Sequence, residues 1–160
     1  MEKSQEPRWI MLPVDNSIHS ERAFDWYVKN LHKPGDKLGI VHIHDPPSPS
    51  EAFGVWDRMV VESENRWREE FQKSIAESKE VIKKFENKAK DCGVDSETFL
   101  TNSNYGPGHA ICDIADRKDA VGIVMGSRGL NFFRRTLLGS VSSYVINHAN
   151  TTVTVTPPSK

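Results

Sequence analysis

The sequence predicts a single α/β domain built on a doubly wound sheet of five parallel strands, with helices on both faces. Short apolar runs alternate with stretches of helical periodicity, in the order β-α-β-α-β-α-β-α-β. Most of the apolar runs lack the alternation of a half-exposed sheet, which is typical of parallel strands buried on both sides. The length of 160 residues suits one domain, which we expect to span residues 1–160.

The first strand and helix are expected within residues 9–31. Residues 9–14, Trp-Ile-Met-Leu-Pro-Val, form an apolar run of strand length. The polar residues after it offer Ser17 or Ser20 as the N-cap of a helix. Apolar side chains in that helix follow the i, i+3, i+4, i+7 spacing, and Pro34-Gly35 ends it. A second buried strand is expected over residues 38–43.

The middle of the chain predicts a loop and one long helix. Residues 46–54 are rich in proline and serine, as expected of a loop. From about residue 57 to residue 92, apolar side chains recur at alternating four- and three-residue steps on one narrow face. Gly93 then occupies the position of a C′ residue. A coiled coil is the alternative, but only about three heptads fit, so the pattern favours a helix packed on the sheet.

The remaining chain predicts two more βα units and a last strand. The expected elements are a strand over 96–101, a loop over 102–108, a short helix around 111–115, a strand over 120–125, a helix over 140–149 and a strand over 151–156. The last strand alternates threonine with valine, so one of its faces should be wetter. Because ligands of such sheets bind at the carboxyl ends of the strands, the loops after strands one, two and four are the expected site.

Composition excludes several classes of protein. Lys plus Arg is 21 and Asp plus Glu is 22, so a globally basic nucleic-acid-binding protein is disfavoured. No apolar run approaches the roughly 18 residues of a membrane helix, and residues 1–8 lack the apolar core of a signal peptide. The two cysteines are expected to be free, buried thiols. We therefore expect no nucleic-acid partner, no membrane contact and a cytoplasmic location.

A spaced set of glycines follows the fourth predicted strand. It reads Gly-x2-Gly-x9-Gly-Ser, from Gly126 through Gly129 to Gly139-Ser140. Glycine allows the backbone to approach a ligand closely or to adopt a positive φ. The first turn of the following helix offers unpaired N–H groups and the positive end of its dipole, and Ser140 and Ser142 add hydroxyl donors. The pattern indicates phosphate binding; the alternative is a set of turn residues and a helix cap.

On these residues the chain resembles the universal stress protein family. The resemblance rests on Met-Gly-Ser-Arg-Gly-Leu at 125–130, Arg-Arg at 134–135, Leu-Gly-Ser-Val-Ser at 138–142 and Val-Asp-Asn-Ser at 14–17, and it covers about residues 8–156. Asn-Phe-Phe at 131–133 is bulkier than the small residues common in the family. The resemblance implies a Rossmann-like fold of the adenine nucleotide alpha hydrolase type. It also implies a stress-response or regulatory protein of the ATP-binding subgroup.

The resemblance further implies a site and an assembly. The nucleoside would contact Pro13, Val14, Asp15 and Ile43, and the phosphates Met125, Gly126, Ser127, Arg128, Gly129, Gly139, Ser140, Val141 and Ser142. The ligand would be ATP, or ADP or AMP, and a bound triphosphate would carry Mg²⁺. A homodimer would form through residues 151–156. Purely structural roles remain open for Asp15, as an Asx-turn; for Ile43, as a core residue; and for Arg128, as a solvated side chain.

Enzyme signatures are weak. The chain has no Gly-x4-Gly-Lys-Ser/Thr loop, and no base is evident beside its serines. His42 and His44 share one face of a strand, but no third metal ligand is evident, so we expect neither catalytic nor metal-binding residues. Two alternatives stay open: a slow ATPase or nucleotidyl-transfer enzyme, and a dimeric interaction module that needs no nucleotide.

Overall fold

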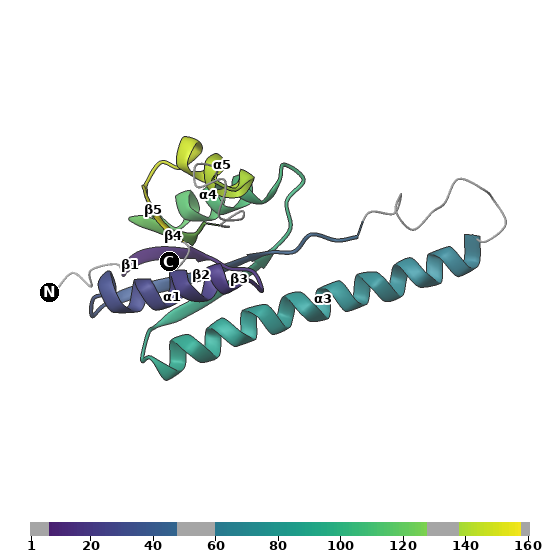
Figure 1. Ribbon diagram of the computed structural model, residues 1–160, viewed down its shortest axis with the longest axis horizontal. Helices are drawn as coiled ribbons and strands as arrows, with labels where there is room; N and C mark the ends of the chain where they lie inside the picture. The colour runs from purple at the N-terminus through teal and green to yellow at the C-terminus, as the bar shows by residue number, and fades with distance from the viewer. Residues whose placement is uncertain (1–6, 48–59, 128–137, 158–160) are drawn as a thin grey trace, which may run out of the picture.

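The computed structural model describes residues 7–47, 60–127 and 138–157, with side chains from residue 64 onward in the second range. It contains the predicted five-stranded parallel sheet, in the order β3-β2-β1-β4-β5 (Figure 1). The elements are β1 (Arg8–Pro13), α1 (Ile18–Asn30), β2 (Asp36–Ile43), α3 (Val60–Asp91), β3 (Ser96–Thr101), α4 (Pro107–Arg117), β4 (Gly122–Gly126), α5 (Ser140–His148) and β5 (Thr152–Thr156). The strand order reverses between β1 and β4, which places the switch point beside β1.

Helices cover both faces of the sheet and separate two apolar clusters. Figure 1 shows α4 and α5 on one face and α1 and α3 on the other. The alternation of a strand sends neighbouring residues to opposite sides, so Met11 of β1 packs with Ile111 while Leu12 packs with Phe24 and Phe85. All five side chains are buried. This double burial explains why the run over residues 9–14 is uniformly apolar.

A buried ion pair fixes the start of the two central strands. Asp36 begins β2, two residues before the predicted start, and receives two hydrogen bonds of 2.6 Å from the Arg8 guanidinium of β1. The backbone N–H of Lys33 adds a third, at 2.8 Å. Burial alone would raise the pKa of Asp36, but these hydrogen bonds and the charge of Arg8 hold it below its ordinary value.

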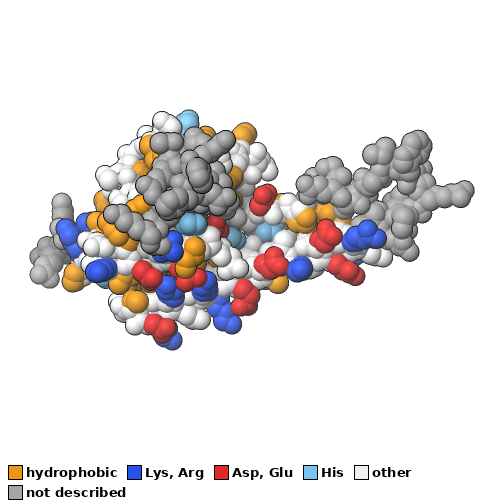
Figure 2. Space-filling model, viewed as in Figure 1, with side chains coloured by type: hydrophobic (Ala, Val, Ile, Leu, Met, Phe, Trp, Pro, Cys, Tyr) orange, Lys and Arg blue, Asp and Glu red, His pale blue; other side chains and the backbone are white. Residues whose placement is uncertain are grey.

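Helix α3 is 32 residues long, about 48 Å at 1.5 Å per residue, and runs well beyond the sheet (Figure 1). Its C-terminal half packs Phe85 and Ala89 into the core, as predicted from the spacing, and also Val81, which the predicted face did not include. Gly93 has φ +67°, and Val94 N–H donates to the Ala89 carbonyl, which confirms the predicted C′ glycine. Figure 2 shows positive and negative side chains interleaved along this helix.

Two further expectations concern membranes and thiols. Within the described residues, no helix combines the length and the apolar character that crossing a bilayer requires.

Cys112 is buried, and burial raises the pKa of its thiol. The expectation of two buried thiols is wrong for Cys92, which is exposed because α3 ends at Asp91 and the chain turns there on the surface.

Candidate functional site

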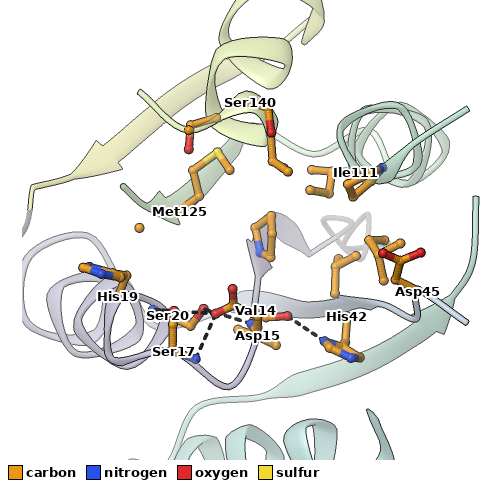
Figure 3. Close-up of a pocket in the computed structure, with 18 of the residues that line it drawn as sticks. Val14, Asp15, Ser17, His19, Ser20, His42, Asp45, Ile111, Met125 and Ser140 are labelled. Atoms are coloured by element: carbon orange, nitrogen blue, oxygen red, sulfur yellow. Dashed lines mark hydrogen bonds between the residues drawn. The ribbon is translucent and has the colours of Figure 1, made fainter. Parts of the chain in front are cut away.

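A cavity of about 490 Å³ opens at the carboxyl ends of β1, β2 and β4. It is lined by Pro13, Val14, Asp15, Ser17, His19, Ser20, Val41, His42, Ile43, His44, Asp45, Ser103, Gly106, Pro107, Ile111, Met125, Gly126, Gly139, Ser140, Val141 and Ser142. Figure 3 shows side chains from both sides of the sheet converging on this space. The volume falls within the range typical of small-molecule sites.

The loop after β1 presents a carboxylate in a fixed orientation. Asp15 Oδ1 accepts hydrogen bonds from Ser17 N–H at 3.0 Å, from Ser20 Oγ at 2.7 Å and from Ser17 Oγ (Figure 3). The N–H of Asp15 donates in return to Ser20 Oγ at 2.9 Å. Ser17 is the N-cap of α1 and accepts from the Ser20 N–H. Asp15 thus does form the Asx-turn that its sequence position allowed, and it lines the cavity as well.

Gly126 brings β4 against the first turn of α1. A Cβ atom at this position would lie 2.5 Å from the His19 carbonyl oxygen and 2.7 Å from its carbon, which are both backbone atoms. Only glycine permits this approach. Gly126 does not have a positive φ, and Gly139 has φ −61°, so the positive-φ explanation of these two glycines is wrong. Close packing is the reason that applies to Gly126.

A Gly126→Ala variant is expected to lose about 1–3 kcal/mol of unfolding free energy, because the added methyl group must displace backbone. Gly122→Ala is the matched control on the same strand, since its Cβ would meet the nearest atom at 3.4 Å, an ordinary contact. Urea denaturation of both variants measures the difference. Equal stability of the two variants would show that the contact between β4 and α1 is looser than described.

The N-terminus of α5 forms the opposite wall of the cavity. Gly139 is its N-cap and makes no side-chain capping bond, and the first turn carries no acidic residue. Helix geometry leaves the N–H groups of Ser140, Val141 and Ser142 without acceptors inside the helix. The first turn of α4, at Gly106 and Pro107, reaches the same cavity. The start of α5, with three N–H groups free to donate, therefore favours an anion, whereas α4 begins with Pro107, which has no N–H.

The structure brings most of the predicted site residues together. Lining the cavity are Pro13, Val14, Asp15, Ile43, Met125, Gly126, Gly139, Ser140, Val141 and Ser142. Ser127 is not among the lining residues; its N–H and its hydroxyl both donate to the Thr156 carbonyl, at 3.0 and 3.1 Å. Arg128 and Gly129 lie outside the described residues.

The sequence prediction missed part of the lining. The loop after β3 contributes Ser103 and Gly106, although only the loops after strands one, two and four were expected. Gly106 has φ +90° and precedes Pro107 at the start of α4. A glycine-proline pair between a strand and a helix was the available signal. His19 and Asp45 also line the cavity without having been predicted.

His42 of β2 and His44, one residue beyond the end of the strand, have partners on α3. His42 contacts the Val14 carbonyl through Nδ1 at 2.8 Å and Ser78 Oγ through Nε2 at 3.2 Å. His44 contacts Ser74 Oγ at 3.0 Å. The predicted shared face is therefore used for packing against α3. Across the described part of the chain, no group of three or more His, Cys, Asp or Glu side chains could hold a metal ion.

Comparison with known proteins identifies related sequences and structures. Universal stress protein A-like protein of Arabidopsis thaliana is 27% identical over 154 residues, covering 90% of this chain and 86% of the relative. An Arabidopsis thaliana universal stress protein family structure with AMP bound has a TM-score of 0.65 at 20% identity and covers 96% of this chain and 93% of that one. The Archaeoglobus fulgidus universal stress protein in complex with dAMP has a TM-score of 0.63 at 24% identity, with 93% and 96% covered.

The two solved structures share the fold described above. The match to the Universal stress protein family itself extends over residues 7–157, which include every strand, every described helix and the whole cavity lining. This chain belongs to the universal stress protein family.

Proposed function

We propose that this protein binds an adenine nucleotide, with ATP as the principal ligand, and acts as a cytoplasmic regulatory protein in a stress response. One observation carries the proposal. A single cavity joins the fixed carboxylate of Asp15, the apolar side chain of Ile43 and the N-terminus of α5. These groups suit a ribose, a base and phosphates in turn.

The phosphate contacts alone cannot supply useful affinity. A charge at a helix N-terminus gains roughly 0.3–1 kcal/mol. Micromolar binding requires about 8 kcal/mol. The apolar lining, with Ile43, Ile111 and Met125, must therefore contribute through burial of the base. This division of roles favours a nucleotide over free phosphate.

The related structures support an adenine ligand, because one holds AMP and another holds dAMP. A triphosphate would extend past Gly126 and Ser140 and bring Mg²⁺ with it. We propose that Arg128 and Gly129 complete the phosphate site, and that Ser127 supports it by holding the start of this loop to the Thr156 carbonyl.

We also propose a homodimer formed through β5. This strand pairs only with β4 in the described sheet, so its other edge offers backbone groups to a second chain. Val153 and Val155 are only half-buried in the single chain. Light scattering coupled to size-exclusion chromatography tests the assembly.

The first experiment is to purify the protein without added nucleotide, denature it, and identify released small molecules by chromatography with mass detection. ATP, ADP or AMP near one per chain supports the proposal. If none is released, calorimetric titration with ATP, ADP and AMP follows. Failure of all three to bind would overturn the proposed function.

A Ser140→Asp variant is expected to weaken ATP binding about tenfold or more while the fold stays intact and becomes slightly more stable. The new carboxylate faces the phosphates, but at the first residue of α5 it also interacts favourably with the helix dipole, by roughly 0.3–1 kcal/mol. Affinity and stability should thus move in opposite directions, as measured by calorimetry and thermal melting. Ser143→Asp is the control, because Ser143 lies on the same helix and does not line the cavity.

A further inference from the structure

The cavity contains a second carboxylate, that of Asp45, which the nucleotide contacts named so far do not use. Asp45 lies two residues beyond the end of β2 and lines the cavity. It makes no hydrogen bond or ion pair with any other residue in the described ranges. The backbone is still held at this point, because His44 N–H donates to the Thr101 carbonyl at 2.7 Å.

The residues at the end of β2 show on which side of the sheet Asp45 lies. His42 and His44 face α3, where they contact Ser78 and Ser74. Ile43 lies on the other face, in the cluster that includes Ile111 of α4. Figure 3 shows the Asp45 side chain beside Ile111, and therefore on the side of Ile43. A base packed against Ile43 therefore has its edge within reach of the Asp45 side chain.

The negative charge of Asp45 indicates which end of a nucleotide, the base or the phosphates, lies beside it. Figure 3 shows Asp45 and Ile111 at one end of the cavity, and His19 and Met125 at the other. A carboxylate repels phosphate, whereas Gly126 and the first turn of α5 suit it. The base must then occupy the Asp45 end. An ionised carboxylate is an acceptor only, so it favours a base edge that carries N–H donors.

We propose that Asp45 determines base specificity by accepting a hydrogen bond from the exocyclic amino group of an adenine that is packed on Ile43. This inference rests on the proposed nucleotide function and adds the group that selects the base. It explains why an exposed carboxylate lies inside a cavity whose other features suit an anion.

The test compares AMP with purine riboside 5′-monophosphate, which differs only by the missing amino group. A hydrogen bond to a charged group contributes about 1.5–3 kcal/mol, and the exposure of Asp45 favours the lower end. Calorimetry should therefore show about tenfold tighter binding of AMP to the native protein. In Asp45→Ala the two ligands should bind equally, at about the affinity of the native protein for the analogue.

Asp91→Asn is the matched control, because it removes one exposed negative charge at the far end of α3 and should keep the tenfold preference. Asp45→Asn, whose amide oxygen still accepts a hydrogen bond, should keep part of it. An unchanged preference in Asp45→Ala overturns the role of Asp45 and leaves the nucleotide function standing. Absence of AMP binding to the native protein overturns both.

Discussion

Asp15→Ala is expected to lower the affinity for adenine nucleotide about hundredfold. The variant removes the carboxylate that we assign to the ribose hydroxyls, and hydrogen bonds to a charged group contribute about 1.5–3 kcal/mol each. It also removes the acceptor that holds Ser17 and Ser20, so the loop loses its preset geometry. Calorimetric titration with AMP and ATP measures the loss directly.

Two further variants separate the charge from the shape of the loop. Asp15→Asn keeps an oxygen that can accept from Ser17 and Ser20, so its melting temperature should stay close to that of the native protein while affinity falls about tenfold. Ser17→Ala removes the N-cap of α1 and should cost about 1 kcal/mol of stability, with little effect on binding. If Ser17→Ala weakened binding as much as Asp15→Ala, loop geometry rather than the carboxylate would be responsible.

Asp36→Ala is expected to reduce the unfolding free energy by about 3 kcal/mol, the largest effect on stability among these variants. The Asp36 side chain is 3% exposed and its partner Arg8 is 33% exposed. Removing one partner of a buried pair typically costs about 3–5 kcal/mol, and the partial exposure of Arg8 favours the lower end. For a domain of this size the melting temperature should fall by roughly 6–12 °C.

The same pair predicts a pH dependence with a definite sign. Because the folded protein holds the pKa of Asp36 below its ordinary value, the ionised carboxylate stabilises the fold fully above about pH 4. That contribution is lost as the pH falls through the lower folded pKa. The stability gap between the native protein and Asp36→Asn should therefore shrink between pH 7 and pH 3 in urea melts. A constant gap would exclude the ion pair as its cause.

The central strands were predictable because their largely apolar residues indicate burial on both faces of the sheet. Met11 and Leu12 are buried in a run that no polar residue interrupts, and Val41 is buried in a run whose one polar residue is His42. The start of β2 was not predictable in the same way, because Asp36 is buried by pairing with Arg8, and hydrophobic patterns do not show a buried ion pair. The partners of this pair are 28 residues apart.

The candidate site was predictable where glycine spacing or a family motif marks it, and not where loops contribute without periodicity. Ser103 and Asp45 belong to irregular segments, so only the topology of the sheet brings them to the cavity. The alternation of β2 predicted that His42 and His44 share a face. It could not predict Ser78 and Ser74 as their partners, because that pairing depends on how α3 crosses the sheet.

The lining of the cavity comes from segments spread between residue 13 and residue 142. During synthesis on the ribosome, the first strand would be made long before the start of α5, so a growing chain has no complete pocket until that helix has left the exit tunnel. Nucleotide would then bind only the finished domain. At a hundredfold excess over its dissociation constant it would stabilise that domain by about 2.7 kcal/mol. On the proposed function, bound nucleotide would thereby make the finished domain more resistant to proteolysis than the growing chain.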